Sequence, residues 1–253
     1  MRLKYVLKLV FRCLVFVFGI ILLAGKDSFL GGTFLGNSFN ILDGFNFFRE
    51  FSIFHILWVL WVVSMLQQII PIKNKLPLGS AKNFAHRFKP GNHDINWQVV
   101  RDYTKTMAKR AYFRVFLLWA AVNAIIGILY YWGPLDNAWI MMISIFFYLC
   151  DLICVVIWCP FRLLLGNRCC TTCRIFNWDH LMMFSPMIFV GGFFGTSLFL
   201  LAVASFMVWE VCIMIYPERF CPQSNICLKC SECTDKLCTQ YCGKKKESKK
   251  QEL

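Results

Sequence analysis

The 36 residues Leu181–Tyr216 read LMMFSPMIFVGGFFGTSLFLLAVASFMVWEVCIMIY, and their single charge is that of Glu210. As one straight helix this stretch would be about 54 Å long, whereas the hydrocarbon core of a bilayer is about 30 Å thick. Pro186 and the three glycines within residues 191–195 are places where a helix can break. The stretch is therefore either one span of about Phe193 to Ile215 after an interfacial or re-entrant segment, or a hairpin of two spans.

The composition of the whole chain indicates a membrane protein. Hydrophobic residues make up 58% of the 253 residues and charged residues 16%, with a mean hydropathy of +0.56. An ordinary soluble domain contains about 25% charged residues. The net charge of +13 suits cytoplasmic loops of a polytopic protein, so we expect no nucleic acid as a partner. We predict an all-α fold, a polytopic transmembrane helical bundle of five or six spans with a Cys-rich C-terminal tail.

Apolar runs predict the spans of a transmembrane domain that covers residues 1–216. These runs lie at about residues 6–24, 51–70, 113–132, 138–158 and 181–216, the last as one or two spans. Residues 217–253 form a separate tail that is rich in Cys and Lys. A cleaved signal peptide is the competing interpretation of the first run, because a basic start and an apolar centre also fit one.

Basic residues predict the orientation in a cytoplasmic membrane. Arg2, Lys4, Lys8 and Arg12 precede or thread the first run, which favours a cytoplasmic N-terminus. The loop 71–114 carries ten Lys or Arg against two Asp, a net charge of +8, and should also lie inside. The second half of this loop has helical periodicity, so we expect a helix that lies in the interface. Its partners would be the lipid bilayer and anionic lipids.

The side of the tail depends on the number of spans. Five spans place residues 217–253 outside, and six place them inside. The tail carries eight basic and five acidic residues, a net charge of +3, which favours the inside. A first hairpin span of roughly 14 residues is shorter than the usual range, which favours the outside. We favour the internal tail.

Ten of the 14 cysteines form two groups outside the apolar runs, at Cys159, Cys169, Cys170 and Cys173 and at Cys221, Cys227, Cys230, Cys233, Cys238 and Cys242. Thiolates two residues apart can converge on one zinc ion, and a CxxCxxC run also occurs in iron–sulfur sites. With an internal tail, the two groups could share one iron–sulfur or Zn site with a redox role. With an external tail, its six cysteines predict three disulfides. Free or regulatory thiols are the third alternative.

Two carboxylates are predicted inside the apolar runs, Asp151 and Glu210. An ionisable group within a span is costly unless it is paired, so each is a functional candidate, with helix packing as the alternative. Cys150 and Cys154 flank Asp151 at helical spacing. A hydrolase or NTPase is not expected, since no nucleophile–base arrangement or Gly-rich phosphate loop is recognisable. Whether the protein is an enzyme stays open.

The segments NRCCTTCRIFNWDH (167–180), ERF (218–220) and KCSECTDKLCTQYC (229–242) together resemble an uncharacterised family of cysteine-rich polytopic bacterial membrane proteins. The resemblance covers about residues 159–242 and implies a bacterial cytoplasmic membrane, but no activity. Three functions follow from the residues: a membrane-anchored metal or redox module, a structural or assembly protein with a zinc- or disulfide-stapled tail, and a small transporter that uses Asp151 and Glu210.

Overall fold

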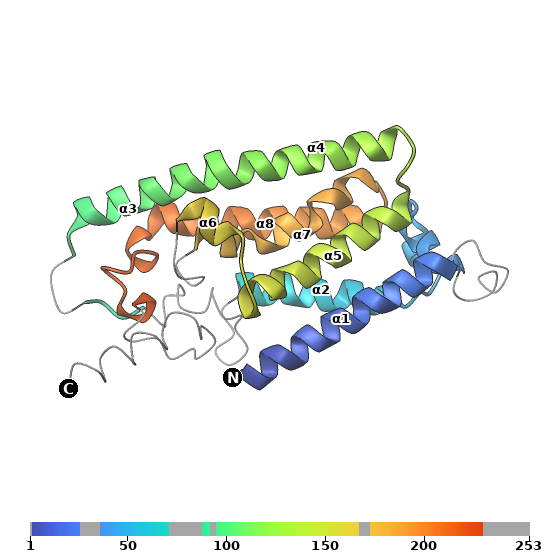
Figure 1. Cartoon of the computed structure of the whole chain (residues 1–253), viewed down its shortest axis with the longest axis horizontal. Helices are drawn as coiled ribbons and strands as arrows, with labels where there is room; N and C mark the ends of the chain where they lie inside the picture. The colour runs from blue at the N-terminus through green and yellow to red at the C-terminus, as the bar shows by residue number, and fades with distance from the viewer. Residues whose placement is uncertain (1, 26–35, 71–87, 92–94, 167–172, 230–253) are drawn as a thin grey trace.

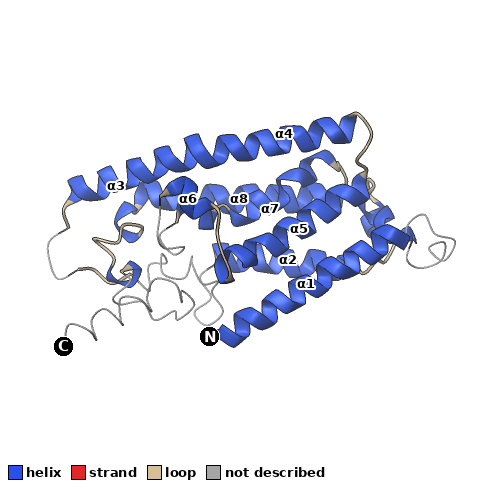
Figure 2. Ribbon diagram, viewed as in Figure 1, coloured by secondary structure: helices blue, strands red, loops and turns tan. Residues whose placement is uncertain are grey.

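The structure is a computed structural model, and it describes residues 2–25, 36–70, 88–91, 95–166 and 173–229. Figure 2 shows these residues as helices joined by loops, with no strand among them. Their β-type pairing is one isolated bridge between Pro90 and Asn225. The prediction of an all-α fold is therefore confirmed for the described part of the chain.

Four helical stretches among the described residues are long and apolar enough to cross a membrane. They are α1 (Arg2–Gly25), the continuous run of α3 (Trp97–Arg110), η6 (Ala111–Phe116) and α4 (Leu117–Tyr131), α5 (Asn137–Val156), and α8 (Phe193–Ile215). A fifth apolar helix, α2 (Phe54–Ile69), has 16 residues and lies among them. Apolar side chains on the outer faces of these helices are exposed, as expected for surfaces that face lipid.

The stretch Leu181–Tyr216 divides where its proline and glycines predict. The short helices α7 (Asp179–Phe184) and η9 (Ser185–Phe189) are followed by Gly191, whose φ of +71° favours glycine, and then by α8 with the predicted bounds. The segment before α8 runs back along it: Trp178 bonds to Glu210 near the end of α8, and Gly192 packs against Leu42 at its beginning. The structure thus combines one full-length helix with a short, broken antiparallel segment.

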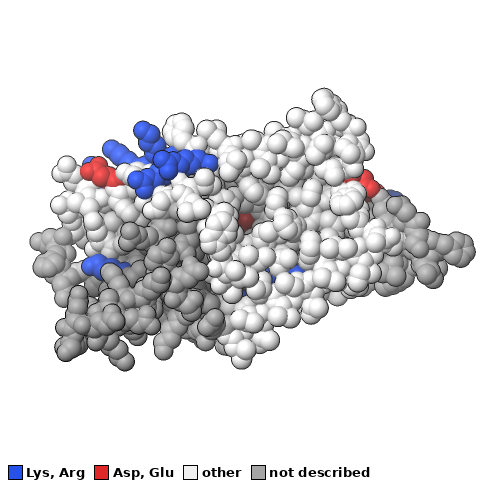
Figure 3. All heavy atoms as spheres, viewed as in Figure 1, with Lys and Arg blue, Asp and Glu red and all other residues white. Residues whose placement is uncertain are grey.

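The bundle has two ends that differ in composition. At the first, the "α3 end", Ile226 N donates to Lys89 O at 3.0 Å, which joins the segment after α8 to the chain before α3. The short helices α6 (Phe161–Leu165), η8 (Arg174–Asn177), η10 (Pro217–Arg219) and η11 (Ile226–Leu228) also lie toward this end. At the second, the "η2 end", lie η2 (Gly36–Leu42) and η3 (Asn46–Phe48), beside the start of α8 (Figure 1). Figure 3 shows Lys and Arg gathered at the α3 end and few charges along the rest of this face.

The helix α3 corrects one expectation. We predicted that it would lie in the membrane interface and then turn into the next span, but it continues straight into α4 through the π-helical turn η6 (Figure 1). The run from Trp97 to Tyr131 has 35 residues and is therefore about 52 Å long. Backbone hydrogen bonds continue through a single turn of π-helix, so α3 and α4 form one uninterrupted helix. A helix of this length is longer than the roughly 30 Å of hydrocarbon in a bilayer.

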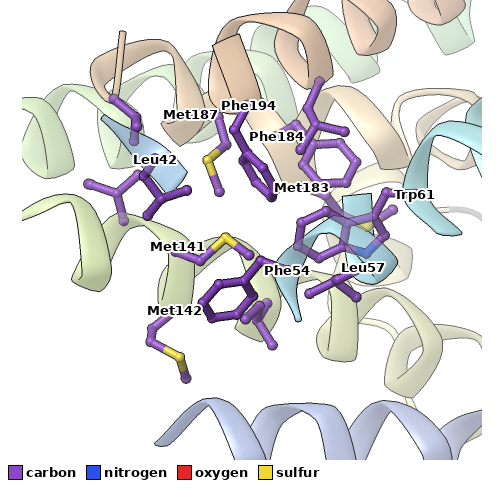
Figure 4. Packing of buried hydrophobic residues seen from close by; sticks show 14 of the residues in the cluster. Leu42, Phe54, Leu57, Trp61, Met141, Met142, Met183, Phe184, Met187 and Phe194 are labelled. Carbon is purple, nitrogen blue, oxygen red and sulfur yellow. The ribbon is translucent and has the colours of Figure 1, made fainter. Parts of the chain in front are cut away.

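The main apolar core fills the space between α2, α5, α7 and α8. Figure 4 shows Trp61, Met141, Phe184 and Phe194 pointing toward one another from these four helices. The rings of Trp61 and Phe184 lie 4.9 Å apart in an edge-to-face arrangement, which is favourable for aromatic pairs. This packing fixes α5 and α7 as neighbours, and the wall between them is where the candidate site begins.

Candidate functional site

A cavity of about 260 Å³ lies toward the α3 end, between α4, α5, α7 and η8. Its walls are mostly aromatic and aliphatic, and they also carry four thiols and two carboxylates. The lining residues from these two classes are Cys150, Cys154, Cys159, Cys173, Asp151 and Asp179. Thiols and carboxylates on an otherwise apolar wall make this cavity the best candidate site in the described part of the chain.

The thiols reach the cavity from one helix end and two adjoining loops. Cys150 and Cys154 are four residues apart on α5 and so share one face of that helix. The helix ends at Val156, and Cys159 follows before Pro160, which cannot continue a helix. The thiol of Cys154 is hydrogen-bonded to that of Cys159, whose residue is only 8% exposed. A partly buried thiol, Cys154, in contact with a buried one, Cys159, is a candidate for reversible disulfide formation.

Asp151 lines the same cavity and has a charged partner. Its Oδ2 accepts a hydrogen bond from Arg12 Nη1 at 2.7 Å, and the guanidinium of Arg12 lies 3.8 Å from the ring centroid of Tyr148. Arg12 and Asp151 belong to α1 and α5, which run antiparallel and pack along their length. The ion pair therefore neutralises a carboxylate within a candidate membrane span and joins these two helices.

Sequence reasoning missed the second carboxylate of the cavity, Asp179. Its Oδ1 accepts a hydrogen bond from Gln68 Nε2 at 3.0 Å and lies 3.0 Å from Nδ1 of His180. Gln68 in turn accepts a hydrogen bond from Ser205, and His180 pairs with Ser64. These contacts come from α2, α7 and α8, so the local sequence showed only an Asp-His pair beside a predicted span.

Glu210 does not line the cavity and is held by four donor groups. Nε of Arg174 donates to Oε1 at 3.2 Å, while a second guanidinium nitrogen of Arg174 bonds to Oε2. Trp178 Nε1 donates to Oε1 at 2.8 Å, and the hydroxyl of Tyr112 donates to Oε2 at 3.0 Å. Glu210 and Arg174 have side chains only 9% exposed. These hydrogen bonds join α8 to η8 and to the π-helical turn η6, which indicates a structural role for Glu210.

The structure describes four of the ten cysteines that were predicted as thiolate ligands. Cys159 and Cys173 lie on the cavity, whereas Cys221 and Cys227 lie in the segment after α8 that pairs with Lys89 and Pro90. The other six, at Cys169, Cys170, Cys230, Cys233, Cys238 and Cys242, lie outside the described residues. Within the described ranges no group of three or more His, Cys, Asp or Glu is arranged to hold a metal ion. The iron–sulfur or zinc site stays a prediction.

No protein-family model, curated protein or solved structure matches this chain. The class of the protein therefore comes from its own helices. Its described residues form helices and no strand, and four of their helical stretches have the length and composition of membrane spans.

Proposed function

We propose that the protein is a multi-pass membrane protein that carries out thiol–disulfide redox chemistry at Cys154 and Cys159. The observation that supports this proposal is the contact between two thiols on the wall of an apolar cavity between candidate membrane spans. A dithiol that closes to a disulfide gives up two electrons and two protons, so the pair needs no metal to act as a redox centre. Cys150 and Cys173 line the same cavity and are candidates to exchange with the pair.

The proposed orientation places the α3 end on the cytoplasmic side of a cytoplasmic membrane. Exposed Arg101, Lys105 and Lys109 lie on α3 at this end, and positive charge favours the cytoplasm. The broken segment of α7 and η9 then returns the chain to the outer side before α8 crosses inward. This path places the start of the tail inside, as the favoured six-span interpretation requires, and leaves the basic face of α3 to meet anionic headgroups.

The redox proposal is tested on the full chain in lipid nanodiscs. The protein is equilibrated in thiol–disulfide buffers, the free thiols are alkylated, and the peptides with residues 154 and 159 are analysed by mass spectrometry. We expect both thiols to become protected together at a defined potential within about −300 to −120 mV, the range of thiol oxidoreductases. In the triple variant Cys150→Ser, Cys154→Ser, Cys173→Ser, which leaves Cys159 without another thiol in the cavity, Cys159 should stay alkylated at that potential.

Cys212→Ser is the matched control, because Cys212 lies on α8 and does not line the cavity. This variant should leave the transition of the pair unchanged. If Cys154 and Cys159 stay fully alkylated throughout that range of potentials, the proposed function is wrong. Metal analysis of the same sample tests the tail prediction separately, since stoichiometric zinc or iron would point to the cysteines outside the described residues.

A further inference from the structure

We infer that the cavity binds the ring of a membrane-dissolved quinone, and that this quinone is the oxidant of Cys154 and Cys159. The inference rests on the proposed redox function and names its electron acceptor. The arguments are the shape and chemistry of the cavity walls, the surroundings of the thiol pair, and the electron count of the reaction.

The walls suit a flat, uncharged ring. Trp119 of α4, Phe146 and Phe147 of α5, Phe161 of α6 and Phe176 of η8 surround the cavity. Aromatic faces pack well against a planar conjugated ring. The volume of about 260 Å³ is slightly below the range of about 300–1,000 Å³ that is typical of sites for drug-sized ligands. A substituted six-membered ring fits this volume, whereas a tripeptide thiol or a nucleotide cofactor is larger.

The surroundings favour a partner that arrives through the lipid. Phe146, on the cavity wall, is 45% exposed on the side of a candidate membrane span. Beyond the end of α5, Ile157 and Trp158 are 60% and 53% exposed beside the buried Cys159. A charged, water-soluble oxidant would lose hydration in reaching Cys159 through such surfaces, but an apolar ring loses none. The cavity is therefore accessible to a lipid-soluble ligand.

The reaction balances with a quinone and nothing else. The S–H bonds of Cys154 and Cys159 break and one S–S bond forms, which releases two electrons and two protons. The quinone accepts both electrons, and its two carbonyl oxygens each gain one proton to give the quinol. Because the acceptor takes two electrons at once, neither sulfur needs to pass through a radical, and no metal or flavin is required.

The test uses the reduced full chain in nanodiscs and a ubiquinone with one isoprene unit, whose fully substituted ring blocks addition of thiols. We expect one quinone to be reduced per protein, followed by its ultraviolet absorbance, with loss of both free thiols. Val155→Trp should fill the cavity, because Val155 lines it, and should slow quinone reduction at least tenfold. Val156→Trp is the matched control, because Val156 is next to Val155 in the sequence but does not line the cavity.

A second oxidant separates the two proposals. Diamide, a small uncharged thiol oxidant, should close the Cys154–Cys159 disulfide in both tryptophan variants. If diamide closes the disulfide but the quinone is not reduced, or is reduced equally by Val155→Trp and Val156→Trp, the quinone inference is wrong and the redox function stands. If neither oxidant closes the disulfide, both proposals fail.

Discussion

Replacement of Glu210 by glutamine tests whether the carboxylate stabilises the fold by joining α8 to η8 and η6. The substitution keeps the shape of the side chain and removes its charge. It also places an NH2 group where one carboxylate oxygen now accepts hydrogen bonds from Arg174 and from either Trp178 or Tyr112. The guanidinium of Arg174, with its side chain 9% exposed, would then be left in a buried position without its counter-ion.

The cost follows from this burial. Removing one partner of a buried ion pair destabilises a protein by about 3–5 kcal/mol, because the remaining charge is uncompensated. That range corresponds to a fall of roughly 150- to 4,000-fold in the folding equilibrium constant. The double variant Arg174→Met, Glu210→Gln removes the orphaned cation, and its glutamine oxygen can still accept from Trp178. We expect this double variant to recover most of the lost stability.

The assay is reversible unfolding in mixed micelles, followed by tryptophan fluorescence and circular dichroism. Trp178, which donates its indole N–H to Glu210, is one of nine tryptophans, so the fluorescence follows unfolding of the whole bundle together with the loss of this contact. Glu218→Gln, in the segment after α8, is the control and should unfold like the wild type. The reasoning is refuted if Glu210→Gln unfolds like this control, or if the double variant is no more stable than the single one.

Two further substitutions test the packing and the orientation. Gly192→Ala should lower the free energy of unfolding by about 2–3 kcal/mol, because its Cβ would lie 2.1 Å from the backbone oxygen of Leu42. Gly25→Ala, with open space around it, should change this free energy by less than about 0.5 kcal/mol, and equal effects at the two positions would contradict the packing. In cells, an impermeant thiol reagent should label Lys105→Cys only after permeabilisation and Phe45→Cys without it, each compared with the unsubstituted chain. The opposite pattern would reverse the proposed orientation.

The boundaries of the helices were largely predictable from the sequence, because they depend on local residues. Pro186 and the glycines that follow it locate the break before α8, and the expected span Phe193–Ile215 is the observed helix. The antiparallel course of the preceding segment was harder to decide, since it depends on contacts with α2 and α8. The continuity of α3 with α4 was missed, because a π-helical turn has no sequence signal as clear as a proline.

The partners of the buried polar groups could not be read from local spacing. Asp151 and Glu210 were recognised as costly inside a span, but their counter-ions come from distant positions, Arg12 being 139 residues from Asp151. The cysteine pair shows the same limit. Cys154 and Cys159 were assigned to a span and to a loop, and their contact arises only because α5 ends between them at Val156.

The three paired carboxylates, of which Glu210 is buried and Asp151 and Asp179 are partly buried, connect the helices around the cavity. Asp151 joins α5 to α1, Asp179 joins α7 to α2, and Glu210 joins α8 to η8 and η6. Each bond is directional and would be lost if the surrounding helices moved together to fill the space, and a lost buried hydrogen bond to a charged group is costly. Apolar packing alone would favour collapse. The contacts of Asp151 and Asp179, which line the cavity, therefore fix the positions of the helices that form its walls, whereas Glu210 acts outside the wall.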